Sequence, residues 1–105
     1  MKLCIVGAGV SGLCSIKRAI EYECEVIAFE QSAEIGGTWI LREDIGKDKY
    51  GLNVHSSMYK YLTTDIPKEV MSYPSYPYPD TDESYISADS VLSYLNNYAT
   101  EFNLF

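Results

Sequence analysis

The chain has 105 residues, about the size of a single domain, and 47% of them are hydrophobic, which is enough to build a buried core. Its 8 basic and 15 acidic residues give a formal net charge of -7, which excludes a surface adapted to nucleic acid or an anionic membrane, because both are polyanions. No apolar stretch reaches the roughly 18 residues needed to span a bilayer, and the three cysteines lack zinc-site spacing, so a metal-free chain in the reducing cytoplasm is expected.

The first predicted element is a short strand over residues 2–6. This stretch is apolar without alternation, which is typical of a strand buried on both faces. After a glycine-rich turn, apolar residues recur at helical spacing from residue 11 to about residue 23. Residues 25–29 then predict a second strand. This order predicts a Rossmann-type βαβ unit of the α/β class, with parallel strands and a right-handed crossover.

The turn between this strand and helix has the pattern G-x-G-x-x-G, which is weak alone but here follows a strand and opens a helix. In this position Gly7 allows the tight turn, Gly9 lets the backbone approach a pyrophosphate, and Gly12 lets the helix and strand pack closely. The N–H groups and dipole of the helix start favour the negative charge. The predicted cofactor-binding residues of the turn are Gly7, Ala8, Gly9, Val10, Ser11 and Gly12.

Glu30 ends the second predicted strand, eighteen positions after Gly12. A carboxylate at this place accepts hydrogen bonds from the adenosine ribose of a dinucleotide and repels a 2′-phosphate. The turn therefore suits NAD or the ADP half of FAD, and not NADP. The alternative is a glutamate that only ends a strand at the protein surface.

Two adjacent glycines, Gly36 and Gly37, follow shortly after and lead into Trp39. They would let a second backbone segment close over the cofactor, and Trp39 offers a flat apolar wall for its ring system. Enclosure from two sides favours FAD over NAD. The alternative is an ordinary loop with a tryptophan in the core.

The second half of the chain contains fewer chemical signals. Three prolines within residues 73–79 exclude a helix there. An apolar stripe over residues 89–102 predicts a C-terminal helix, with Ser87 or Asp89 as its N-cap. The single His55 lacks the partners of a catalytic triad or metal site.

Five ordered motifs run through most of the chain: GAGVSG at 7–12, FE at 29–30, GGTW at 36–39, SSMYKYLTTDIPKEVM at 56–71 and YPSYPYP at 73–79. Together they resemble the N-terminal FAD-binding segment of the flavin-containing monooxygenases. Members of this family use NADPH to reduce a tightly held FAD and, with O₂, oxygenate soft nucleophiles. The resemblance implies a small nitrogen or sulfur compound as substrate. It also implies that the full-length enzyme lies in the cytoplasm or on the cytosolic face of the endoplasmic reticulum.

The resemblance further implies which residues meet the cofactors. Besides the glycine turn and Glu30, it assigns Thr38 and Trp39 to contact with FAD. It assigns Thr64 and Asp65 to the place where flavin and nicotinamide meet, with Asp65 as the candidate catalytic residue. The family pattern has asparagine where this chain has Asp65. An amide donates and accepts hydrogen bonds whereas an ionised carboxylate only accepts, which counts against productive oxygenation.

Complete family members are several times longer and carry a second glycine-rich motif for NADPH, which nothing after Gly37 provides here. Residues 1–105 are therefore expected to be the N-terminal part of an FAD-binding domain, incomplete and inactive alone, without the NADPH-binding domain. Two alternatives stay open. One is another flavoprotein with two dinucleotide domains, such as a Baeyer–Villiger monooxygenase or an amine oxidase. The other is a short protein that binds an adenine dinucleotide or a partner without catalysis.

Overall fold

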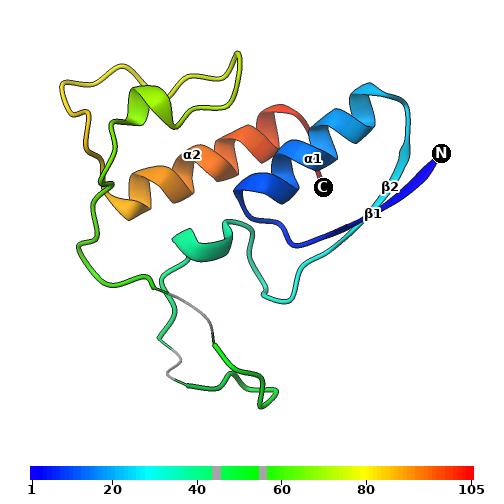
Figure 1. The fold of residues 1–105 in the computed structure, drawn as a ribbon, viewed down its shortest axis with the longest axis horizontal. Coiled ribbons are helices and arrows are strands. Elements are labelled where there is room, and N and C mark those ends of the chain that lie inside the picture. The colour runs from blue at the N-terminus through cyan, green and yellow to red at the C-terminus, as the bar shows by residue number, and fades with distance from the viewer. Residues whose placement is uncertain (44–45, 55–56) are drawn as a thin grey trace.

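A parallel two-stranded sheet with one helix packed against it forms the N-terminal part of the molecule (Figure 1). The computed structural model describes residues 1–43, 46–54 and 57–105. Strands β1 (Lys2–Val6) and β2 (Glu25–Phe29) pair along their whole length, and α1 (Val10–Glu21) connects them. The predicted βαβ order with parallel strands is confirmed.

The second long helix, α2 (Ala88–Glu101), lies beside α1 (Figure 1). The hydroxyl of Ser87 accepts a hydrogen bond from the backbone N–H of Ser90, so one of the two predicted N-caps is confirmed. Between β2 and α2 the chain is irregular apart from two short 3₁₀ helices, η1 (Gly37–Trp39) and η2 (Lys68–Val70). His55 and Ser56, the first residue of the motif at 56–71, lie outside the described residues.

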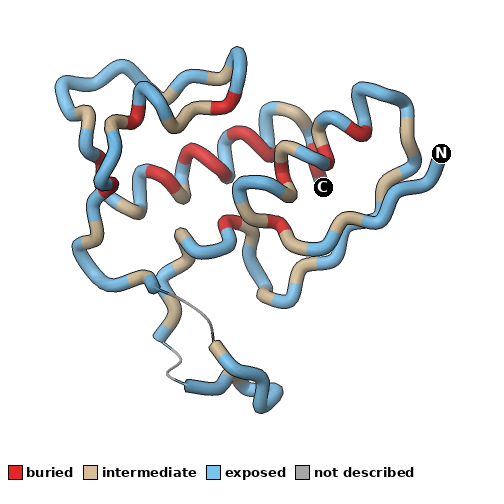
Figure 2. The backbone as a smooth tube through the Cα atoms, viewed as in Figure 1, coloured by how far each residue is buried: buried red, intermediate tan, exposed pale blue. Residues whose placement is uncertain are grey.

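The hydrophobic core lies between α1, α2 and the proline-rich segment, where Figure 2 shows the buried stretches of α2. Leu13 of α1 and Val91 and Leu95 of α2 are at most 1% exposed. The proline-rich segment is not helical, as predicted, and its tyrosines pack on α2. The ring centroids of Tyr73 and Tyr98 are 4.1 Å apart.

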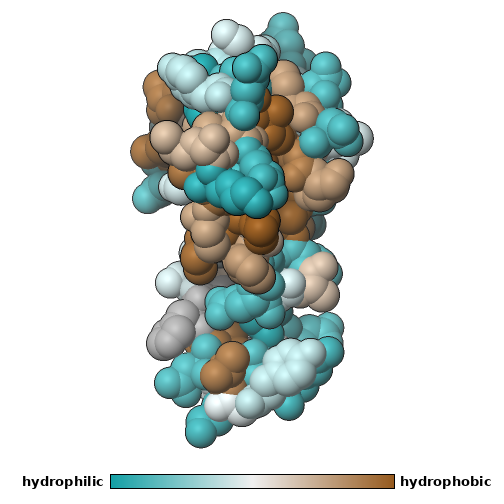
Figure 3. All heavy atoms as spheres, turned by 90° about the vertical axis from the view of Figure 1, so that its right-hand side faces the viewer, coloured by the Kyte–Doolittle hydropathy of each residue, from teal (hydrophilic) through white to brown (hydrophobic). Residues whose placement is uncertain are grey.

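The prediction that the first strand is buried on both faces is wrong. Ile5 and Val26 pack toward the core, but Val6 is 84% and Phe29 60% exposed. Successive side chains of a strand point to opposite faces, so the bare face is the one turned away from α1. Figure 3 views the molecule from the side on which the N-terminus lies in Figure 1, and apolar residues are visible at the surface there. The physical reason is that one helix covers one face of a sheet that, in the described part of the chain, has two strands.

Candidate functional site

The glycine-rich turn after β1 has a backbone geometry that requires glycine. Gly7 has a φ of +96°, in the left-handed region, and its N–H donates to the carbonyl of Phe29 at 2.7 Å. A Cβ on Gly12 would lie 2.0 Å from the carbonyl oxygen of Gly7. The turn follows β1 directly and is hydrogen-bonded to the end of β2. The first turn of α1 can lie this close to Gly7 only with glycine at position 12.

The N-terminus of α1 is open to a ligand. Gly9 is the N-cap residue, and no side chain caps the first N–H groups of the helix. The carbonyl of Gly9 accepts the hydrogen bond of Leu13 at 3.0 Å, and the first turn contains no acidic residue. The N–H groups of this turn, at Val10, Ser11 and Gly12, carry the positive end of the helix dipole, which favours an anion there.

The second glycine pair packs directly on this turn. The N–H of Gly36 donates to the carbonyl of Ala8 at 3.0 Å. A Cβ on Gly37 would lie 3.0 Å from the Cα of Gly9, so the two backbones meet with no room for a side chain between them. Both glycines of the pair have positive φ values, +128° and +59°. Two motifs that are distant in sequence thus form one wall.

The carboxylate of Glu30 is held by two backbone donors. One oxygen accepts a hydrogen bond from the N–H of Ala8 at 2.7 Å, and the other accepts one from the N–H of Ser32 at 2.8 Å. Partial burial works to raise the pKa of Glu30, but these backbone hydrogen bonds outweigh it and hold the pKa below its ordinary value. Each oxygen keeps a further lone pair for a ribose hydroxyl. The negative charge that repels a 2′-phosphate is therefore present at neutral pH.

A cleft of about 390 Å³ opens between these elements. Four residues predicted to bind the cofactor line it: Gly7, Gly9, Glu30 and Thr38. The other residues of the glycine turn stand beside the cleft without lining it: Ala8, Val10, Ser11 and Gly12. The structure therefore brings together the glycine turn, the ribose carboxylate and the start of η1.

Three residues predicted to meet the cofactors lie outside the lining of this cleft. Trp39 is half-buried and packs against the hydrophobic core. Thr64 is 5% exposed, and its Oγ1 accepts a hydrogen bond from the N–H of Ile86 at 3.2 Å. The N–H of Thr64 donates to the carbonyl of Ile86 at 2.9 Å. Thr64 thus fastens its segment to the residues that lead into α2, while its neighbour Asp65 is exposed.

Residues that the motifs do not mark also line the cleft, among them Ser32, Arg42 and Asn53. The backbone N–H of Ser32 holds Glu30, which no side-chain pattern reveals. Arg42 brings a cation to the cleft that contains the open helix end. Its place soon after the glycine pair, at the start of a charged stretch, is the signal that could have marked it.

A family model described as flavin-binding monooxygenase-like matches residues 1–105. The chain belongs to this family. Several curated relatives are named flavin-containing monooxygenases, so the predicted resemblance is confirmed. The chain spans about a fifth of the length of the curated relatives it matches.

Individual relatives of this flavin monooxygenase-like chain match it almost from end to end. Senecionine N-oxygenase of Tyria jacobaeae is 33% identical over 103 residues, which are 98% of this chain and 23% of that protein. The structure of S-allyl-L-cysteine S-oxygenase from Allium sativum has a TM-score of 0.87 and 32% identity, covering 98% of this chain and 26% of that one. The structure of oxidised steroid monooxygenase bound to NADP has a TM-score of 0.72 and 25% identity. The match covers 99% of this chain and 18% of that one.

Membership of the flavin-binding monooxygenase-like family confirms the α/β Rossmann-type segment and the family cofactors, FAD and NADPH. Within the described ranges, no group of three or more His, Cys, Asp or Glu residues is arranged to hold a metal ion. None of the helices in those ranges is long and apolar enough to cross a membrane.

Proposed function

We propose that this chain is the N-terminal part of the FAD-binding domain of a monooxygenase that uses NADPH and O₂ to oxygenate nitrogen or sulfur in small molecules. The contact between Gly9 and Gly37, beside the fixed carboxylate of Glu30, carries the proposal. It creates a cleft bounded by bare backbone, the N-cap residue of α1 and the carboxylate of Glu30. This combination suits the pyrophosphate and ribose of an adenine dinucleotide.

The residues of the cleft fit the ADP half of FAD. The N–H groups of the first turn of α1, which stand beside the cleft, would hold the pyrophosphate, and Glu30 in the lining would accept hydrogen bonds from the ribose. Gly37 and Thr38 would cover the cofactor from the other side. FAD supplies the redox and oxygen chemistry when bound, while the chain binds and orients it.

Trp39, Thr64 and Asp65 are assigned to the flavin end of the cofactor. FAD extends beyond its ADP half, so contacts to the flavin are expected outside the ADP cleft. Asp65 is exposed and follows the anchored Thr64, which supports a defined position for its carboxylate. We assign Asp65 as the catalytic residue in place of the asparagine of the family pattern, and Thr64 as its anchor.

The substrate is assigned as a small nucleophilic nitrogen or sulfur compound. Similarity to an N-oxygenase at 33% identity and to an S-oxygenase at 32% supports this class. The steroid monooxygenase is less similar, at 25% identity, which favours nitrogen or sulfur oxygenation over other flavin monooxygenase reactions.

The proposal is tested by ligand protection of the 105-residue chain against thermal unfolding. FAD and ADP should raise the unfolding temperature, because they bind the folded state through the cleft. NADP should raise it less, because its 2′-phosphate meets the charge of Glu30. Equal or stronger protection by NADP would contradict the assignment of the cleft.

A further inference from the structure

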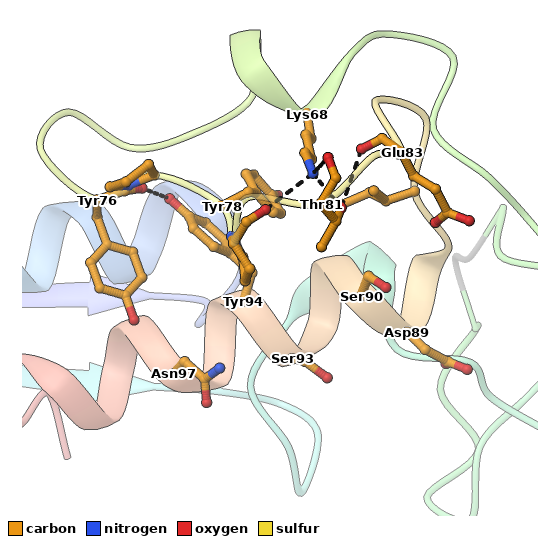
Figure 4. A pocket seen from close by; sticks show the side chains of 13 residues that line it. Lys68, Tyr76, Tyr78, Thr81, Glu83, Asp89, Ser90, Ser93, Tyr94 and Asn97 are labelled. Carbon is orange, nitrogen blue, oxygen red and sulfur yellow. Dashed lines mark hydrogen bonds between the residues drawn. The ribbon is translucent and has the colours of Figure 1, made fainter.

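A second and larger cavity lies between the proline-rich segment and one face of α2 (Figure 4). Its volume is about 610 Å³. It shares no lining residue with the dinucleotide cleft. The proposed function gives this cavity no role.

One wall of the cavity is aromatic and already rigid. Tyr94 is 4% exposed, and its hydroxyl accepts a hydrogen bond from the N–H of Tyr73 at 2.8 Å and donates one to the carbonyl of Tyr76 at 2.6 Å. The ring of Tyr78 stacks on that of Tyr94 at 3.8 Å with an interplanar angle of 13°. A ligand would meet this apolar wall without having to order it first, which favours binding.

The polar residues of the lining come mainly from α2, from the same helix face that carries Tyr94. Ser90, Ser93 and Asn97 recur at helical spacing on one face, and Figure 4 shows them along the side of the helix that borders the cavity. Their hydroxyl and amide oxygens can accept hydrogen bonds from a ligand. The cavity thus combines an apolar wall with a row of polar acceptors.

The charges around the cavity favour a cation. Glu83 and Asp89 line it, and neither carboxylate forms a hydrogen bond or ion pair with another residue that the structure describes. Both are therefore free to meet a ligand of opposite charge.

Lys68, the basic residue in the lining, cannot donate a hydrogen bond to an anionic ligand. It is 5% exposed, and its ammonium donates to the carbonyls of Pro79 at 3.1 Å and Thr81 at 3.2 Å. The third proton goes to the Oγ1 of Thr81 at 2.5 Å. An ammonium group has three donors, so Lys68 has none left for a ligand (Figure 4).

From these observations we infer that the cavity is a binding site for a small organic cation with an apolar body, of the arylammonium or alkylammonium class. The apolar body contacts the tyrosine wall, and the cationic group faces Glu83 and Asp89. This site is separate from the dinucleotide cleft, and the inference does not depend on the proposed function.

Nuclear magnetic resonance titration of the complete 105-residue chain tests the inference. The probes are benzylammonium, the neutral benzyl alcohol and the anionic benzoate, which share one ring and differ in charge. Benzylammonium should shift the backbone amide signals of residues 76–83 and 89–97, and those of residues 7–12 should stay in place. Benzyl alcohol should bind more weakly and benzoate more weakly still. Saturating ADP should not displace benzylammonium, because the two cavities share no lining residue.

Two double variants distinguish the effect of the carboxylates in the cavity from the effect of the net charge of the chain. Glu83→Gln/Asp89→Asn should weaken benzylammonium binding about fivefold, as expected for exposed charge pairs, and leave benzyl alcohol unaffected. Glu34→Gln/Glu101→Gln makes the same change in net charge at exposed positions outside this cavity and should leave both affinities unchanged. Equal affinity for all three probes, signal shifts spread over the chain, displacement by ADP or no effect of the first double variant would each overturn the inference.

Discussion

Gly9 and Gly37 touch through their backbones although they belong to different turns. A Cβ on Gly37 would lie 3.0 Å from the Cα of Gly9, and one on Gly9 would lie 3.4 Å from the Cα of Gly37. The hydrogen bond from Gly36 N–H to the Ala8 carbonyl holds the turns together beside this contact. The wall of the dinucleotide cleft therefore requires glycine most strictly at position 37, because a Cβ there would be the closer of the two and φ is positive.

We expect Gly37→Ala to weaken ADP binding at least about tenfold, because the new methyl group pushes the two turns apart. The matched control is Gly51→Ala. Both glycines have positive φ values, +59° and +77°, but a Cβ on Gly51 meets nothing within 4 Å. Each variant should lose roughly 1–2 kcal/mol of stability from the left-handed backbone, and only Gly37→Ala should also lose ADP affinity. Calorimetric titration and urea unfolding measure the two effects, and equal ADP affinities would show that the contact is not needed.

Glu30→Gln should weaken ADP and FAD binding about tenfold, in line with the loss of hydrogen bonds to a charged group worth about 1.5–3 kcal/mol. It should also reduce the preference for ADP over NADP, because the repulsion of the 2′-phosphate disappears. Glu34→Gln, a nearby exposed carboxylate, is the control with the same charge change. The measurement is the ratio of ADP and NADP dissociation constants in each variant. An unchanged ratio in Glu30→Gln would remove Glu30 from the specificity of the cleft.

Local sequence could predict the elements of the site and their order. The glycine turn, α1 and β2 follow each other within thirty residues, so periodicity and turn chemistry are sufficient there. The position of Glu30 at the end of β2 follows from the same local pattern. The lack of side chains at Gly36 and Gly37 predicted that a second backbone segment comes close to the cofactor site, but not that it contacts the glycine turn itself.

Contacts between distant segments could not be predicted in this way. Thr64 meets Ile86, and the hydroxyl of Tyr73 donates to the carbonyl of Val10, across 22 and 63 positions of the chain. Such pairs depend on how the irregular segment between β2 and α2 folds back on α2. The sequence of that segment has no helical or strand periodicity from which its path could be predicted. The same holds for the burial of Lys68 against Pro79 and for the exposed outer face of the sheet.

The tyrosine cluster predicts a loss of stability in alkaline solution. Burial raises the pKa values of Tyr78 and Tyr98 to about 12, above the ordinary value of 10.0. The unfolded chain therefore loses these phenolic protons first, so the free energy of unfolding should fall as the pH rises from about 10 to about 12. Urea unfolding across this range measures the fall. Tyr98→Phe should make it shallower, whereas Tyr22→Phe, at an exposed position, should not.

The 105-residue chain with added FAD should not oxidise NADPH. The described residues provide one glycine-turn cleft, which suits the FAD, and a sheet of two strands whose outer face is bare. Among the described residues, a hydride donor therefore finds no second glycine-turn site on which to dock. Absorbance at the NADPH band, followed with and without FAD, measures the rate. Sustained turnover would show that the chain needs no further nucleotide-binding domain.

The last prediction concerns Asp65, which is exposed and follows the anchored Thr64. In a full-length enzyme carrying this segment, Asp65→Asn should lower the amount of H₂O₂ released per NADPH consumed. An ionised carboxylate only accepts hydrogen bonds, whereas an amide also donates, and a missing donor to a developing negative charge typically costs about 3 kcal/mol. Asp80→Asn removes another exposed carboxylate, one that is not assigned to the cofactors, and should leave the H₂O₂ yield unchanged.

Measurements of product yield, FAD content and unfolding temperature separate a role of Asp65 in the chemistry from a role in folding. If Asp65 meets the flavin, Asp65→Asn should raise the product formed per NADPH while the FAD content and the unfolding temperature stay the same. Thr64→Val removes the hydroxyl that accepts from Ile86, and it should increase leakage with either residue at position 65, because the anchor of the segment is lost. Equal H₂O₂ yields from the parent enzyme and Asp65→Asn, at equal FAD content, would show that this side chain does not act on the oxygen chemistry.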